Sequence, residues 1–239
     1  MTSQPMQIQQ WKQFALILAY TLAIAFLAAF GIRAQQLRKG VSVHMVSTTS
    51  AQPMPAADDE DAWVIAITDE GRLFFGVDPV SSTELLEKMK STPRRRDQNL
   101  YIKADARAPF IQVRNVLEAA KEDLFESPVL LTSQHAHLQP GTMVPPTGLE
   151  VLLAQSSAGS EPPVVQVRST GKESPSIEVN HHPVPQADLQ RMLVELLRNQ
   201  SEKNVALEAD GKLPFAQIAQ VIDACHAAGA RVILATPEI

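Results

Sequence analysis

Two aspartates lie in nearly the same short phrase of the sequence. Residues 101–113 read YIKADARAPFIQV and residues 206–218 read ALEADGKLPFAQI, so Asp105 and Asp210 each follow an apolar run and precede a Pro-Phe pair. A carboxylate at such a position can bind a ligand or carry a proton, or it can accept hydrogen bonds from backbone N–H groups of the turn and the helix start. No acid–base partner, nucleophile or set of metal ligands recurs beside them. We therefore favour a mainly structural role for both.

Other residues with reactive or metal-binding side chains do not form a recognisable constellation. His135 and His137, like the pair His181 and His182, lie in polar, proline-flanked segments without cysteines or carboxylates at ligand spacing, so solvated loop histidines are expected. Cys225 is the single cysteine, which excludes an intrachain disulfide, and it lies on an apolar helix face. We expect no enzyme, no metal and no cofactor.

Each aspartate precedes a predicted amphipathic helix. Proline suits the first turn of a helix, where its missing N–H would have no partner, and Pro109 and Pro214 mark the two starts. Apolar residues follow at i, i+3, i+7 and i+10 in both helices: Phe110, Val113, Leu117 and Ala120, then Phe215, Ile218, Ile222 and Cys225. Burying each large side chain of this stripe is worth about 1.5–3 kcal/mol, so the flanking strands must supply a sheet that covers it.

The phrase belongs to a longer internal repeat. Shifting residues 102–119 by 105 positions onto 207–224 gives seven identities in eighteen positions. Predicted strands and helices recur in the same order, which indicates an α+β fold with two tandem β-β-α-β-α-β domains. The predicted domains are residues 62–133 and 163–239, joined by a Pro/Gly/Ser-rich linker, 134–162, in which residues 149–154 form a short ordered piece.

The N-terminal region predicts a membrane anchor. Residues 14–32 contain no charge, and nineteen residues of helix span roughly 28 Å, close to the apolar core of a bilayer at about 30 Å. A cleaved signal peptide is the alternative, but its apolar stretch is normally about 7–15 residues. The expected organisation is therefore a short tail (1–13), a single transmembrane helix (14–32) and a polar tether (33–61) with one short strand at 41–43.

Charge gives weaker information. The net charge of −5 argues against a nucleic-acid partner, and the run Arg94-Arg95-Arg96 is expected in a solvated loop. One basic residue, Lys12, precedes the span, and three follow it: Arg33, Arg38 and Lys39. Because basic residues tend to remain on the cytoplasmic side, this favours a cytoplasmic location for the part of the chain after the span.

The ordered set of features resembles the ExbD/TolR family. The residues that carry the resemblance are Gly71, Pro79-Val80, Leu85, Ala104-Asp105 and Pro109-Phe110, and the second copy, from 176 to 236, is similar to the same domain. The resemblance implies a single-pass inner-membrane protein with a periplasmic bulk, against the flanking charges. It also implies a role in biopolymer transport or envelope maintenance, a channel subunit of the ExbB/TolQ type as partner, and TonB/TolA-like proteins or peptidoglycan as further partners. A homodimer or an internal pseudo-dimer is expected.

Two features depart from that family. Its motor members carry an aspartate within the span, whereas residues 14–32 contain no group that ionises near neutral pH. The domain is also present twice. A structural or regulatory accessory subunit is therefore expected, and a membrane-tethered tandem binding module for peptidoglycan or an envelope protein is the alternative.

Overall fold

The computed structural model describes residues 40–95, 97–133, 145–153, 162–171 and 174–234. The predicted tail and transmembrane helix, residues 1–32, lie outside this part of the chain, as do His135 and His137. Among the described residues, no helix has both the length and the apolar character needed to cross a bilayer.

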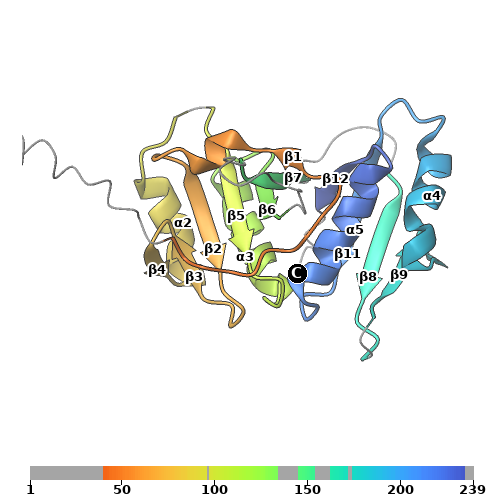
Figure 1. Ribbon diagram of the computed structural model, residues 1–239, viewed down its shortest axis with the longest axis horizontal. Coiled ribbons are helices and arrows are strands. Elements are labelled where there is room, and N and C mark those ends of the chain that lie inside the picture. The colour runs from red at the N-terminus through yellow and green to blue at the C-terminus, as the bar shows by residue number, and fades with distance from the viewer. Residues whose placement is uncertain (1–39, 96, 134–144, 154–161, 172–173, 235–239) are drawn as a thin grey trace, which may run out of the picture. The chain divides into compact units, whose positions relative to one another are not determined.

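The two repeats contain the same elements in the same order (Figure 1). The first comprises β2 (Trp63–Ile67), β3 (Leu73–Phe75), β4 (Asp78–Val80), α2 (Ser82–Ser91), β5 (Leu100–Ala104), α3 (Phe110–Glu122) and β6 (Val129–Thr132). The second comprises β8 (Val164–Arg168), β9 (Ser176–Val179), β10 (His182–Pro183), α4 (Gln186–Leu197), β11 (Asn204–Ala209), α5 (Phe215–Ala227) and β12 (Arg231–Leu234). The predicted α+β class is confirmed. The predicted order lacked one short strand per repeat, β4 and β10, each of which closes a hairpin.

The strands of both repeats form one sheet in the order β10-β9-β8-β11-β12-β7-β6-β5-β2-β3-β4. Each repeat contributes a parallel set, β8-β11-β12 or β6-β5-β2, with an antiparallel hairpin at the outer edge. The strand that joins them is β7 (Thr147–Leu153), which is antiparallel to β6 and parallel to β12. This strand falls within the predicted linker, and it is longer than the ordered piece expected there.

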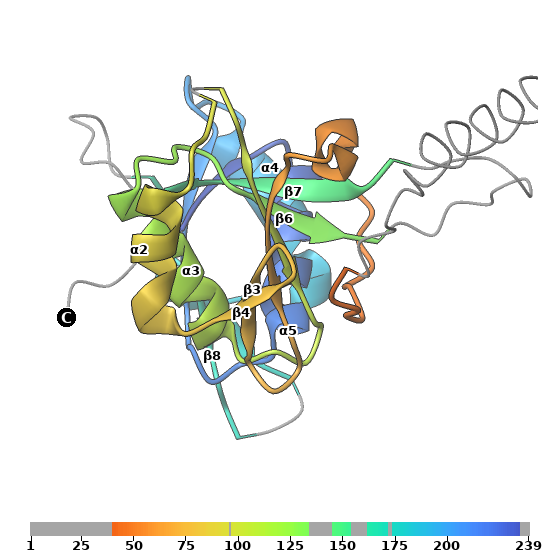
Figure 2. The same ribbon diagram turned by 90° about the vertical axis from the view of Figure 1, so that its left-hand side faces the viewer.

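The helices pack on the sheet and enclose the larger of two apolar clusters, and the smaller one contains Ala57, Tyr101, Val129 and Leu131. Helix α2 packs beside α3, α4 packs beside α5, and α3 also contacts α5, so the two repeats meet through helices as well as through strands (Figures 1 and 2). The predicted stripes are confirmed, because every residue of both is buried in one cluster that extends through both repeats. The repeats therefore share a core.

The segment expected to be a polar tether is folded onto the repeats from Gly40 onward. It contains β1 (Gln52–Pro53), which pairs with β7, and a short 3-10 helix η1 (Pro55–Asp58). The strand expected at 41–43 is not present. Residues 41–50, hereafter the strap, run along the first repeat and reach the second. Their backbone groups bind residues far away in the sequence, which local patterns do not reveal.

Candidate functional site

The Asp105 carboxylate holds together a tight loop at the end of β5. The Asp105 backbone N–H donates to Ile67 O at 2.8 Å, which extends the β2–β5 pairing by one bond. Asp105 Oδ1 accepts from the Arg107 N–H at 3.0 Å and from Arg107 Nε at 3.2 Å, and Oδ2 accepts from the His44 N–H at 2.9 Å. Asp105 is only 3% exposed. Its carboxylate therefore links the turn to the strap.

The electrostatics of Asp105 favour the ionised form. Burial raises the pKa of the Asp105 carboxyl, but the N–H groups of Arg107 and His44 and the guanidinium of Arg107 outweigh it, so the pKa lies below the usual value. Arg107 also pairs with Asp69 at 3.0 Å, and its own pKa is raised by the bond to Asp105. A carboxylate that remains charged and hydrogen-bonded is suited to holding backbone, and it is a poor proton carrier near neutral pH.

The Asp210 loop repeats this geometry at the end of β11. Asp210 N–H donates to Val167 O at 2.9 Å, and Asp210 Oδ1 accepts from the Lys212 N–H at 3.0 Å. The next bond of the turn, from Leu213 N–H to Asp210 O, is 3.1 Å, against 3.0 Å for Ala108 N–H to Asp105 O. The two loops are thus the same structure in both copies.

The two copies of the phrase contact each other. Phe110 N–H donates to Leu213 O at 2.9 Å, and Phe215 N–H donates to Ala108 O at 2.8 Å. The next residues repeat the exchange: Ile111 N–H donates to Gly211 O and Ala216 N–H to Ala106 O, each at 2.9 Å. Every bond has a counterpart at a shift of 105 residues, which is the pattern of a two-fold interface between identical surfaces.

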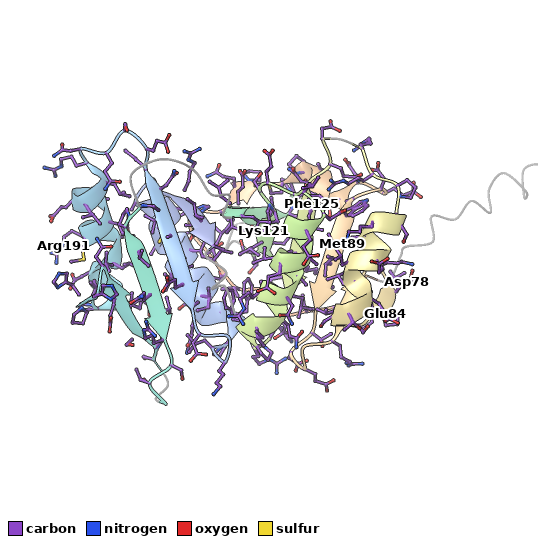
Figure 3. All side chains as sticks on the ribbon, turned by 180° about the vertical axis from the view of Figure 1, so that it is seen from behind. Asp78, Glu84, Met89, Lys121, Phe125 and Arg191 are labelled. Atoms are coloured by element: carbon purple, nitrogen blue, oxygen red, sulfur yellow. The ribbon has the colours of Figure 1, made fainter. Side chains whose placement is uncertain are left out.

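This exchange of hydrogen bonds explains how α3 and α5 can begin after a proline, which has no side-chain group to cap them. The sequence predicted Pro109 and Pro214 in the first turn of each helix. They are instead the N-caps of α3 and α5, and neither provides a side-chain cap. The first four N–H groups of a helix have no partner within the helix, and here each helix donates the first two of them to carbonyls of the other repeat. By contrast, α2 satisfies its own first turn through a capping box between Ser81 and Glu84, and Glu84 is labelled in Figure 3.

The strap binds both repeats. Val46 O accepts from the Ser133 N–H at 2.8 Å, and Thr48 N–H donates to Ser133 O at 3.0 Å. Asp223 of α5 then accepts from the Thr49 N–H at 2.9 Å and from the Ser50 N–H at 2.7 Å. Sequence reasoning missed this role of Asp223, because Thr49 and Ser50 lie 174 and 173 positions earlier in the chain.

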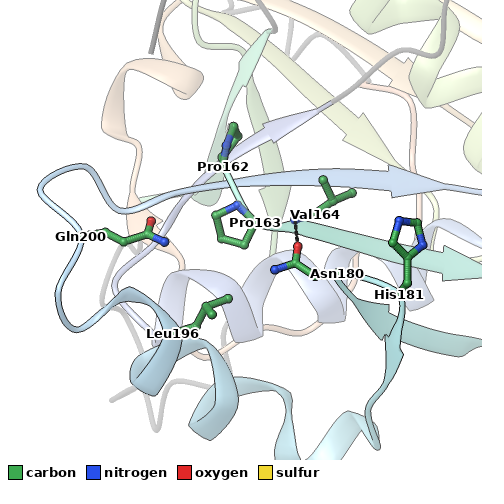
Figure 4. Close-up of a pocket in the computed structure, with 7 residues that line it drawn as sticks. All are labelled: Pro162, Pro163, Val164, Asn180, His181, Leu196 and Gln200. Atoms are coloured by element: carbon green, nitrogen blue, oxygen red, sulfur yellow. Dashed lines mark hydrogen bonds between the residues drawn. The ribbon is translucent and has the colours of Figure 1, made fainter. Parts of the chain in front are cut away.

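The remaining candidates do not form a site. His181 and His182 lie at the β9–β10 turn, where Asn180 and His181 adopt φ of 50° and 66° and Asn180 Oδ1 accepts from the Val164 N–H (Figure 4). No group of three or more His, Cys, Asp or Glu side chains in the described segments is placed to hold a metal ion. Cys225 is fully buried, and burial raises the pKa of its thiol to about 12.

Arg94 and Arg95 lie in an exposed loop, as expected, and their side chains also bind neighbouring parts of the fold. Arg94 donates to Asp123 O at 2.8 Å and its guanidinium lies 4.1 Å from the centre of the Phe125 ring, whereas Arg95 pairs with the exposed Asp61 at 3.0 Å. Arg96 lies outside the described residues. Arg94 therefore binds the backbone at the C-terminal end of α3.

The fold and the reciprocal bonds between the two copies of the phrase define a class of protein in which two α+β domains pair through backbone hydrogen bonds. Comparison with known families identifies the class. The family described as biopolymer transport protein ExbD/TolR matches residues 20–135 and, a second time, residues 140–238, so the chain belongs to that family and carries its domain twice. None of the curated proteins compared with the chain matches it.

Proposed function

We propose that the protein is an inner-membrane accessory subunit of a biopolymer-transport or envelope-maintenance complex linked to the proton-motive force. The observation that carries the proposal is the double match to the ExbD/TolR family, whose members are accessory subunits. The partner is a channel subunit of the ExbB/TolQ type, with a TonB/TolA-like protein or peptidoglycan as further partners.

The proposal includes the anchor and the domain limits. Residues 14–32 form the transmembrane helix, and the two ExbD/TolR-like domains, 62–133 and 163–239, lie in the periplasm. The first family match begins at residue 20, inside the apolar stretch, and this supports an anchor that is part of the family domain and not a removable leader. Asp105 and Asp210 serve the structure of the loops, in line with their bonds to backbone N–H groups.

The subunit is structural or regulatory and does not carry the protons itself. An ion-coupling group inside the bilayer needs an ionisable side chain, and residues 14–32 offer only Tyr20 and Thr21 as polar side chains. The proton path therefore belongs to the partner.

Co-purification tests the assignment. The full chain, extracted in mild detergent, is expected to retain a channel subunit of the ExbB/TolQ type. The matched control replaces residues 14–32 by a leucine-rich span of equal length, which keeps the anchor but removes the helix surface that the channel would contact. Membrane insertion of both chains, with the partner retained only by the native one, supports the proposal. Absence of the partner from both contradicts it.

The missing ionisable residue also favours a second candidate, a membrane-tethered tandem module that binds peptidoglycan or an envelope protein without any motor. Sedimentation of the protein with purified cell-wall sacculi, in cells where no channel subunit associates with it, would support this candidate over the first.

A further inference from the structure

The two aspartate loops are alike in backbone but differ in what covers them. The first is covered by the strap, which contributes the backbone N–H and C=O of one residue, His44. Its N–H donates to Asp105 Oδ2 at 2.9 Å, and its C=O accepts from the Ala106 N–H at 2.8 Å. Both contacts use only the backbone of His44. The N–H and C=O of one residue on an extended strand point to the same side, which is how one strand pairs with the next.

The corresponding atoms of the second loop are Asp210 Oδ2 and the Gly211 N–H. Asp210 Oδ1 is used by the Lys212 N–H, as Asp105 Oδ1 is used by Arg107. Within the described residues, neither Asp210 Oδ2 nor the Gly211 N–H has a hydrogen-bond partner. Asp105 is buried under the strap, whereas Asp210 is partly exposed.

The position of these two groups is fixed by the rest of the junction. Gly211 O accepts from the Ile111 N–H at 2.9 Å, and a Cβ on Gly211 would lie 3.0 Å from Ile111 Cβ, so the loop backbone is held against α3. The Asp210 side chain is held by its own turn. The second loop therefore offers an acceptor and a donor at the same positions of the turn as the pair that binds His44 in the first repeat.

We propose that the Asp210–Gly211 loop binds one residue of an extended peptide segment from a partner protein. The carboxylate of Asp210 accepts the N–H of that residue and the Gly211 N–H donates to its C=O, as Asp105 and Ala106 do for His44. Recognition through the backbone is a form of strand addition, in which main-chain bonds provide the affinity. The inference does not rest on the proposed accessory role, because it follows from the difference between the two loops of one chain.

A peptide that covers the strap except for Ser50, VSVHMVSTT (residues 41–49), is a suitable probe because the same residues bind the equivalent loop in the first repeat. The fluorescently labelled peptide is titrated against the full chain in detergent, with anisotropy as the readout. The native chain is expected to bind it saturably.

Asp210→Asn is the decisive variant. The amide oxygen can still accept from the Lys212 N–H and keep the turn, but its NH₂ then faces the N–H of the peptide. Binding is expected to fall at least tenfold. Asp188→Asn, which removes an exposed carboxylate of α4 that pairs with Arg191, makes the same change of charge and should leave binding unchanged.

A second probe tests the other partner of the bond. The same peptide N-methylated at its histidine lacks the N–H that Asp210 would accept, and its binding to the native chain should fall to the level of the Asp210→Asn variant. Equal binding by Asp210→Asn and native chains, or by the methylated and unmethylated peptides, overturns the proposal. So does binding that appears only after removal of residues 235–239, which would make the chain's own terminus the occupant. Absence of binding to the native chain overturns it as well.

Discussion

At the scale of residues, the same side chain has unequal surroundings in the two copies. Asp105 and Asp210 form the same turn, and both accept the N–H of the residue two positions later. Only Asp105 also binds the strap and lies beside an arginine. A repeated residue therefore does not guarantee a repeated energetic contribution, because the contribution depends on what the rest of the chain places against it.

Replacing Asp105 by Asn is expected to destabilise the protein by about 1–3 kcal/mol near neutral pH, because the N–H of His44, which is part-buried in its bond to Asp105, would then face an NH₂ group. The folded-state pKa of Asp105 is lowered, so its contribution is present above the unfolded value near 3.9 and is lost as the pH falls through the folded value. Urea unfolding at pH 7 and at pH 3 measures both effects. The difference between native and Asp105→Asn chains should shrink at pH 3, and a constant difference would contradict the role of the charge.

Cys225 is expected to be inert in the folded protein. Its thiol is buried and its pKa is raised to about 12, whereas the reactive species is the thiolate. A thiol reagent such as DTNB at pH 8 should not label the native chain and should label one thiol in denaturant. Rapid labelling without denaturant would show that α5 moves away from the core in the folded protein and exposes Cys225.

At the scale of elements, periodic patterns predicted the helices and strands that depend on neighbouring residues and missed the segments that depend on contacts distant in sequence. The stripes of α3 and α5 and the first strands of each repeat follow from spacing and residue type alone. The strap and the full extent of β7 could not be predicted in the same way, because their partners, such as Asp223 for Thr49 and Val129 for Glu150, are distant in sequence or belong to another repeat. The lack of a polar cap before α3 and α5 could not identify the junction either, because Pro185 before α4 also provides no side-chain cap and α4 makes none of the reciprocal bonds.

Strand β7 is expected to tolerate no added side chain at Gly148. A Cβ there would lie 2.4 Å from Val129 Cγ1 and 3.1 Å from Leu130 O, so Gly148→Ala should cost about 1–3 kcal/mol through overpacking. Gly40→Ala is the matched control, because nothing lies within 4 Å of the added atom. Chemical denaturation measures both variants. Adding Val129→Ala should recover part of the loss, and no loss in the single variant would mean that β7 does not pack as described.

At the scale of the whole molecule, the two repeats are expected to fold and unfold as one unit. They share one sheet, one large core cluster and four reciprocal bonds between the two phrases. The sequence predicted an internal pseudo-dimer as one of two arrangements, since a repeated surface can pair within a chain or between chains. Repetition alone could not decide between them.

A cysteine pair tests this arrangement in the intact chain. Ile111→Cys combined with Gly211→Cys places two thiols where the Cβ atoms lie 3.0 Å apart, slightly closer than the usual 3.5–4.5 Å of a disulfide. Mild oxidation should give a cross-linked monomer that migrates faster on a non-reducing gel. Ile111→Cys alone should not. A product of twice the mass from the double variant, with no cross-linked monomer, would show that the phrases pair between chains.

The reciprocal junction also has a consequence for how the protein can change over time. In an assembly of two identical chains, any substitution appears on both sides of the axis at once, and the surfaces evolve in step. Here the two sides are separate stretches of one chain, so they can differ from each other, as Ala106 differs from Gly211 and Arg107 from Lys212. One half is free to specialise while the other preserves the original contact.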